Sequence, residues 1–210
     1  MVSGFGLIFI WAAFYLLAGL VSLSGPLLAD VTPPLLLFGL TALTLVHQRA
    51  WRQAGRLFRW PGAATVSAGA VAGAGLWLLA DAIVLLEQRL HHHLQANNPL
   101  LLQPRLFRSP WHLALLVAAV AVLAPFAEEL FYRGLVFGWL RERLPLAGAI
   151  VASGVAFGLA HLVPTLALPL GVVGCGLAYI YERSRSLWPS MAAHAALNVL
   201  SLAFAYARIH

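Results

Sequence analysis

Residues 125–134 read Pro-Phe-Ala-Glu-Glu-Leu-Phe-Tyr-Arg-Gly and place two adjacent acids, Glu128 and Glu129, close to one arginine, Arg133. The sequence before them is apolar, and residues 113–123 contain no polar side chain. An ionised group in the hydrocarbon core of a membrane costs at least about 2.5–3.5 kcal/mol, so such groups are rare and usually functional. This stretch therefore predicts a membrane-spanning helix that carries a functional site.

The composition of the whole chain favours a helical membrane protein. The chain has 210 residues, of which 61% are hydrophobic and 10% are charged, whereas a soluble domain has about 25% charged residues. Several apolar runs reach the roughly 18 residues needed to cross a bilayer, and we find no alternating strands of about ten residues, as in a membrane barrel. We predict an all-α fold, a polytopic transmembrane helical bundle of about seven (six to eight) spanning helices. Residues 1–210 are expected to form a single integral membrane domain.

The expected helices follow the apolar runs and end near glycine, proline or arginine. A short loop is expected between the first two, from Gly25-Pro26 to Thr32-Pro33-Pro34. The fourth run is long for a single span, so we expect either a tilt or a kink at Pro125. The seven predicted helices are Ser3–Ser24, Leu35–Val46, Ala63–Leu86, Trp111–Arg143, Leu146–Val163, Thr165–Tyr181 and Trp188–Tyr206.

The basic residues are interpreted as topology signals. The formal charge is +6, and all thirteen basic residues are arginines that lie mainly between apolar runs. Orientation and lipid headgroup contacts explain this pattern better than nucleic-acid binding. Residues 47–60 are either a basic cytoplasmic loop or a short amphipathic helix on the membrane surface. With that segment inside the cell, the arginine distribution predicts a cytoplasmic N-terminus, and arginine without lysine suggests a bacterial protein of the inner (plasma) membrane.

Three further features carry little functional weight. The single cysteine, Cys175, excludes an intrachain disulfide. Asp81 lies in the third apolar run and is interpreted as a helix-end acid near the interface. The run His91–His93 is expected to be a solvated loop, because three consecutive residues do not share a helix face.

The acids of the opening stretch divide into two roles by helical geometry. Glu129 and Arg133 are four residues apart and can pair along one face. Glu128 points about 100° away from Glu129, so it need not share that ion pair. One acid can thus be held by the arginine while the other stays free to react.

Two later helices carry polar residues at the same spacing. Phe157 and His161 lie on the fifth predicted helix, and His194 and Asn198 lie on the seventh. Each residue alone could simply bind helices together. As a set, they are best satisfied by converging with the acids on one wet cavity.

The residue types in such a cavity point to hydrolysis. A buried carboxylate is a usable general base, a histidine can share a water with it, and a second histidine and an amide can stabilise an oxyanion. Such a cavity would support hydrolysis of an amide without a serine or cysteine nucleophile. The alternative is a zinc site made of His161, His194 and a carboxylate such as Glu128, although the HExxH motif is absent.

The ordered motifs resemble the CPBP intramembrane proteases, which include the eukaryotic CaaX prenyl endopeptidase and bacterial Abi-type proteins. The pattern is EExxxR at 128–133, FxxxH at 157–161 and HxxxN at 194–198. The resemblance covers residues 111–207 as a catalytic core, whereas residues 1–110 contain no recognised motif.

The resemblance implies a role for each matched residue. Glu128 corresponds to the glutamate that activates water, with help from His161, and His194 and Asn198 correspond to the oxyanion-stabilising pair. The supporting residues that it implies are Glu129, Arg133 and Phe157. A metal-free, glutamic-type mechanism is favoured over zinc, because Asn198 is a poor zinc ligand and a good oxyanion donor.

The implied function is an intramembrane endopeptidase that cuts near the membrane-embedded or lipidated C-terminus of a membrane-anchored protein, with C-terminal sorting signals as one substrate class. One alternative is a rhomboid-type serine protease using Ser153, but Val151 stands where that family has a glycine. The other is a non-catalytic transporter, substrate-binding or immunity protein with the same polar cavity. The expected partners are a protein substrate and the lipid bilayer, without nucleic acid.

Overall fold

The computed structural model describes residues 26–47, 55–90 and 109–209, together with a few residues between 4 and 14. Every regular element in these ranges is helical, which confirms the predicted all-α class. The elements before the central helix are α2 (Pro26–His47) and α4 (Ala63–Leu90). The central helix is built from α5 (Pro110–Val117), η3 (Ala118–Leu123), α6 (Ala124–Glu129), η4 (Leu130–Phe137) and α7 (Gly138–Arg141). It is followed by α8 (Leu146–Ala160), η5 (Pro164–Leu166), α9 (Ala167–Ser184) and α10 (Leu187–Ile209).

Four helices among the described residues are long and apolar enough to cross a membrane. They are Ala63–Leu90, Pro110–Arg141, Pro164–Ser184 and Leu187–Arg208. Two shorter apolar helices accompany them, Thr32–Leu45 and Leu146–Ala160. The first predicted helix, residues 3–24, lies largely outside the described residues. These helices identify the chain as an integral membrane protein.

Several predicted boundaries differ from the structure, and two of the differences concern proline. The loop expected from residue 25 to residue 34 is helical, because α2 begins at Pro26 and continues through Pro33 and Pro34. Proline ends most helices of soluble proteins but is tolerated within membrane helices, where neighbouring groups satisfy the freed carbonyls. The fifth helix ends at Ala160 rather than Val163, and η5 precedes α9.

The basic segment at residues 47–60 is only partly described. Residues 55–57 are helical and residues 59–62 are irregular, while residues 48–54 lie outside the described ranges, so both interpretations of this segment stay open.

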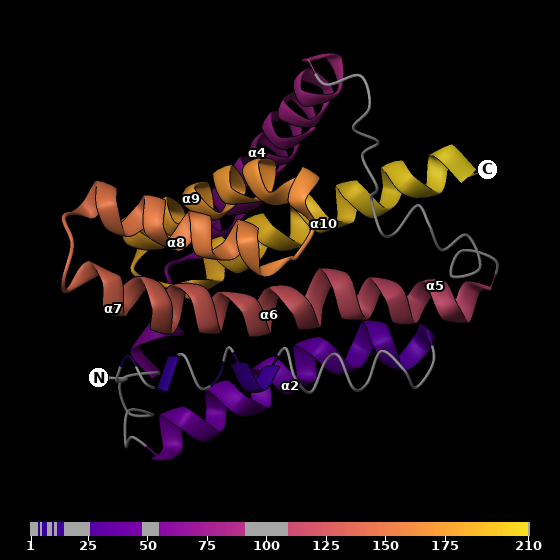
Figure 1. Ribbon diagram of the computed structural model, residues 1–210. Coiled ribbons are helices and arrows are strands. Elements are labelled where there is room, and N and C mark those ends of the chain that lie inside the picture. Colours follow the sequence, from indigo (N-terminus) through magenta and orange to yellow (C-terminus); the bar gives the residue numbers. More distant parts are fainter. Residues whose placement is uncertain are drawn as a thin grey trace.

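The central helix lies between two groups of helices (Figure 1). On one side, α2 packs against η3, α6 and η4. On the other side, α8 packs against η4 and α7, and α10 packs against η3 and α6. α4 packs against α9 and α10 and does not belong to the layer of α2. The acid-bearing segment α6 is therefore enclosed by helices from both halves of the chain.

Two helix pairs approach closely through glycine. A Cβ atom at Gly69 or Gly73 of α4 would overlap the backbone of Pro189 or Ala193 of α10. A Cβ atom at Gly158 of α8 would likewise overlap the backbone of α9. Small residues at such crossings let membrane helices approach closely and pack. These contacts fix the positions of α8 and α10, which carry the later motifs.

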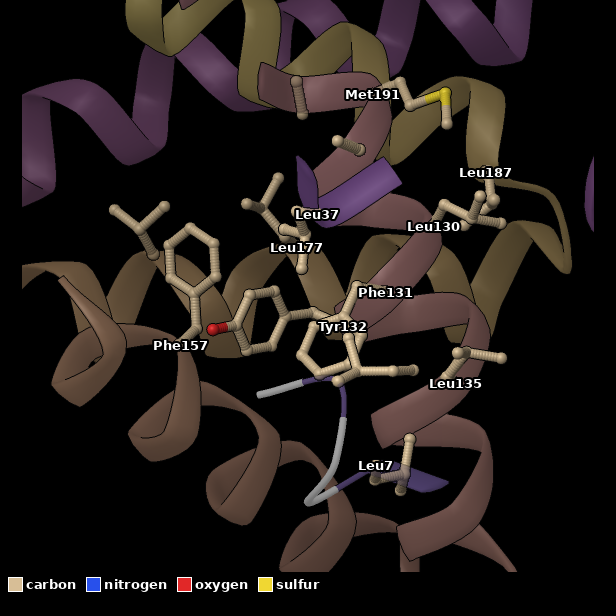
Figure 2. Packing of buried hydrophobic residues seen from close by; sticks show 14 of the residues in the cluster. Leu7, Leu37, Leu130, Phe131, Tyr132, Leu135, Phe157, Leu177, Leu187 and Met191 are labelled. Atoms are coloured by element: carbon tan, nitrogen blue, oxygen red, sulfur yellow. The ribbon is translucent and has the colours of Figure 1, made fainter. Parts of the chain in front are cut away.

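An apolar core surrounds the helix turns that follow the acids (Figure 2). The Tyr132 ring meets the Phe131 ring at a centroid distance of 5.0 Å and the Phe157 ring of α8 at 5.1 Å, both edge to face. The other labelled core residues come from the central helix and four further segments: Leu7, Leu37, Leu130, Leu135, Leu177, Leu187 and Met191. This packing fixes the rotation of the central helix, and with it the directions of Glu128 and Glu129.

Candidate active site

A fully buried ion pair forms the base of the site. Arg133 Nη1 lies 2.9 Å from Glu129 Oε1, and neither side chain is exposed. The second guanidinium nitrogen of Arg133 donates a hydrogen bond to the carbonyl oxygen of Gly174 in α9, at 3.1 Å. The guanidinium also lies 4.7 Å from the centre of the Phe157 ring. The pairing predicted from helical spacing is thus present, and it also joins the central helix to α8 and α9.

His194 of α10 lies between the two acids. Its Nδ1 is 3.1 Å from Glu129 Oε1, and its Nε2 is 3.9 Å from Glu128 Oε2. Because a carboxylate accepts hydrogen bonds, the Nδ1 atom donates and carries the proton. In the neutral ring the Nε2 atom therefore presents a lone pair toward Glu128.

Glu128 differs from Glu129 in its surroundings. Its side chain is 23% exposed, whereas that of Glu129 is fully buried. The Oε2 atom of Glu128 is nonetheless buried and has no hydrogen-bond partner among the described residues. Two acceptors, this oxygen and His194 Nε2, face each other beyond hydrogen-bonding distance. A proton or a water molecule between them would satisfy both, which is an arrangement suited to proton transfer.

His161 lies at the C-terminal end of α8 and is exposed. Its Nδ1 lies 2.9 Å from the carbonyl oxygen of Phe157, which can only accept, so Nδ1 carries the proton, and Nε2 has no hydrogen-bond partner in the described part of the chain. The Phe157 ring contacts both histidine rings edge to face, at centroid distances of 4.9 Å for His161 and 5.6 Å for His194. Among the described residues no hydrogen bond joins His161 to Glu128. The acid has His194 as its near neighbour instead.

Asn198 donates a hydrogen bond to a carbonyl oxygen that has no backbone donor within the central helix. Its Nδ2 donates to Val120 O at 2.7 Å. In an α-helix that oxygen would accept from Ala124, but the Ala124 N–H bonds Ala119 O, five residues back, in the π-helical η3. The next residue, Pro125, has no N–H to donate. Asn198 therefore replaces the missing backbone donor, and its second N–H stays available.

Sequence reasoning missed the two backbone acceptors, Gly174 and Val120. A glycine-rich stretch in α9 gave no sign that its carbonyl would receive Arg133. Pro125 did carry a signal for Val120, because a proline in a membrane helix always leaves a carbonyl without its helical donor.

A cavity of about 360 Å³ adjoins the site and is reached by His161 and Asn198. Its walls come mainly from α4, α9 and α10 and are mostly apolar, and its remaining polar lining residues are Asp81, Gln88, Ser201 and Arg208. Asp81 lies nine residues before the end of α4 at Leu90, and its interpretation as a helix-end acid near the interface stays a prediction. The residues His91–His93 lie outside the described ranges.

The alternative metal site is not assembled. Within the described ranges, no three side chains of His, Cys, Asp and Glu are close enough together to hold a metal ion. The set His161, His194 and Glu128 therefore does not fit zinc in this arrangement. Ser153, the candidate nucleophile of the rhomboid alternative, is fully buried, and its hydroxyl has no hydrogen-bond partner among the described residues.

The fold and the site define an integral membrane protein in which two acids, an arginine and a histidine are grouped inside the helical bundle, while His161 and Asn198 line an adjoining cavity. Residues 110–200, somewhat less than half of the chain, match the family model "Type II CAAX prenyl endopeptidase Rce1-like". This stretch contains all three motifs. The match supports the resemblance to the CPBP intramembrane proteases and, at the level of that family, a peptidase.

A curated relative points to the same class. The chain is 29% identical over 84 residues to "Putative membrane peptidase YdiL" of Bacillus subtilis (strain 168). The match covers 40% of this chain and 34% of that protein, so the chain matches about a third of the relative's length. No solved structure matches this chain.

Proposed function

We propose that this protein is an intramembrane endopeptidase that hydrolyses a peptide bond with a water molecule activated by Glu128. The observation that carries the proposal is the unpartnered Oε2 atom of Glu128, 3.9 Å from His194 Nε2, in a segment whose family indicates a peptidase. A buried acceptor without a partner is costly, and such atoms are retained where chemistry needs them.

The reaction begins when the Glu128 carboxylate takes a proton from water while the oxygen attacks the carbonyl carbon of the peptide. The carbonyl oxygen becomes an oxyanion, and the second N–H of Asn198 is our candidate donor for it. When the carbon–nitrogen bond breaks, the proton moves from Glu128 to the leaving amine. His194 Nε2 is placed to share that proton with Glu128.

Glu129 and Arg133 act as positioning residues in this scheme. Glu129 fixes the proton of His194 on Nδ1, so that Nε2 faces Glu128. Arg133 pairs with Glu129 at 2.9 Å and holds its carboxylate in place beside His194. His161 adds a second free imidazole nitrogen, which reaches the cavity and can bind the incoming peptide.

The proposed substrate is a membrane-anchored protein, cut near its membrane-embedded or lipidated C-terminus. The matching family model is that of type II CAAX prenyl endopeptidases, and the curated relative bears the name of a membrane peptidase. Processing of C-terminal sorting signals in a bacterial inner membrane, with the N-terminus in the cytoplasm, is the setting that we propose. The mechanism is proposed to need no metal, because the alternative ligand set is not assembled.

The deciding experiment compares Glu128→Gln with Glu142→Gln. Both changes remove one negative charge, but Glu142 is exposed and follows the end of the central helix. We expect membranes with Glu128→Gln to leave substrate C-termini uncut and those with Glu142→Gln to cut normally, as measured by mass spectrometry of C-terminal fragments. Normal cleavage by Glu128→Gln would refute the assignment of the base.

A further inference from the structure

Asp81 is an acid that the proposed reaction does not use. It lies within α4, nine residues before the helix ends at Leu90, on a helix otherwise rich in glycine, alanine and leucine. No ion pair or hydrogen bond joins it to any residue in the described ranges. It nevertheless lines the same cavity as His161 and Asn198.

The helix packing explains why Asp81 faces this cavity. Gly73 of α4 packs directly against Ala193 of α10. Beyond that crossing the two helices diverge toward their C-terminal ends (Figure 1), and the cavity occupies the opening. Trp77 and Asp81 follow Gly73 at four-residue steps, so they share its face of α4. Trp77 reaches across to Phe204 of α10 at a centroid distance of 5.8 Å, and Asp81 lies one turn further on.

The other charged group on the cavity wall is already engaged. Arg208 is exposed near the end of α10, and its guanidinium lies 4.4 Å from the centre of the Phe204 ring. It makes no ion pair with Asp81. Within the described part of the chain, Asp81 is therefore an acid of the cavity wall without a partner of opposite charge.

The shape and chemistry of the cavity match a basic side chain. A volume of about 360 Å³ is at the small end of the range for ligand pockets, roughly 300–1,000 Å³, so it suits a side chain rather than a folded segment. Lysine and arginine combine an apolar stem with a charged end. The stem would lie along wall residues such as Val84, Leu170 and Val173, and the charged end would meet Asp81.

We propose that this cavity is the subsite for a lysine or arginine side chain of the substrate, close to the bond that is cut, and that Asp81 is its specificity-determining residue. The inference rests on the proposed peptidase function, because it places the basic residue beside His161 and Asn198. It narrows the substrate class to membrane proteins with a basic residue next to the cleavage site.

The first test profiles cleavage of a mixed peptide library in detergent, with cut sites identified by mass spectrometry. Wild-type protein is expected to enrich Lys or Arg at one fixed position relative to the cut. Asp81→Asn should lose that enrichment by about tenfold or more while still cutting peptides without a basic residue, and Asp81→Arg should shift the preference to Asp or Glu. The matched control, Glu87→Gln, removes an acid from the same helix outside the cavity lining and should leave the profile unchanged. An unchanged profile in Asp81→Asn, or an equal loss for all peptides, would overturn the proposal.

A second measurement separates this inference from the peptidase function. A dansyl-labelled pentylammonium probe and its uncharged acetylated form are titrated against Glu128→Gln protein by fluorescence anisotropy. The subsite predicts tighter binding of the cation, by about tenfold, and loss of that difference when Asp81→Asn is added. This result would support the subsite even if no form of the protein cleaved any peptide. Absence of cleavage would refute only the peptidase function. Equal binding of the two probes would refute the subsite.

Discussion

His194 Nδ1 and Arg133 Nη1 converge on the same oxygen, Oε1 of Glu129, at 3.1 and 2.9 Å. The buried acid is thus shared between a residue of its own helix and a residue of α10. Glu129 should therefore matter both for the stability of the protein and for catalysis. A change at Glu129 tests the stability, and a change at His194 tests the catalysis.

Removal of the Glu129 charge should destabilise the protein. Glu129→Gln leaves Arg133 buried without its anion, a loss that costs roughly 3–5 kcal/mol in buried pairs. Thermal unfolding of purified protein, followed by tryptophan fluorescence, should shift to clearly lower temperature. The double change Glu129→Gln with Arg133→Met should recover part of the loss, whereas Glu142→Gln should have almost no effect. A single variant as stable as wild type would show that the pair contributes nothing.

His194 should matter for turnover more than for binding. His194→Gln removes the nitrogen that faces Glu128, and general acid–base groups contribute about 10²–10⁴-fold to rate. We expect kcat to fall by about a hundredfold or more, with KM within a few-fold of wild type. If KM rises while kcat is unchanged, His194 binds substrate instead of moving a proton.

The bond from Asn198 to Val120 should be coupled to Pro125. Asn198→Leu leaves the part-buried carbonyl of Val120 without a donor, and we expect a cost of about 1 kcal/mol in unfolding free energy. Pro125→Ala restores a backbone N–H near that carbonyl, so the cost of Asn198→Leu should shrink in the Pro125→Ala background. A double-mutant cycle of unfolding free energies measures this coupling, which should exceed about 0.5 kcal/mol. Strict additivity would contradict the replacement of a backbone donor by Asn198.

A side chain at Gly73, where α4 crosses α10, should destabilise the protein. Gly73→Ala places a Cβ against the Ala193 backbone, next to His194, and overpacking of this kind costs about 1–3 kcal/mol. Both stability and cleavage should fall. Gly75→Ala is the matched control, since a Cβ there meets no atom within 4 Å. Equal behaviour of the two variants would mean that the helices are not in close contact.

Treatment with a chelator tests whether the reaction needs a metal ion. We expect purified protein to keep its activity after treatment with phenanthroline and to contain substoichiometric zinc by elemental analysis. Loss of activity that zinc restores would establish a metal-dependent enzyme. In that case His161, His194 and Glu128 would have to move together, because they form no ligand set in the described structure.

Pairs within one helix could be predicted residue by residue, whereas between helices the sequence predicted only that the polar residues converge, not which of them touch. The spacing of Glu129 and Arg133 alone placed them on one face, and the structure pairs them. The contact of Glu129 with His194 joins residues 65 positions apart, and no periodicity reports which helices become neighbours. The helix through Pro33 and Pro34 was missed because the usual meaning of proline changes inside a membrane bundle.

The open carbonyl at Val120 also has a consequence for biosynthesis. The donor that satisfies it, Asn198, lies 78 residues further along the chain. When the central helix leaves the ribosome, this donor has not yet been made, and lipid offers no substitute. We therefore expect the acid-bearing helix to stay in a polar setting, such as the insertion machinery or a water-filled groove, until α10 joins it. Truncation before α10 is expected to leave a segment that inserts poorly into the membrane.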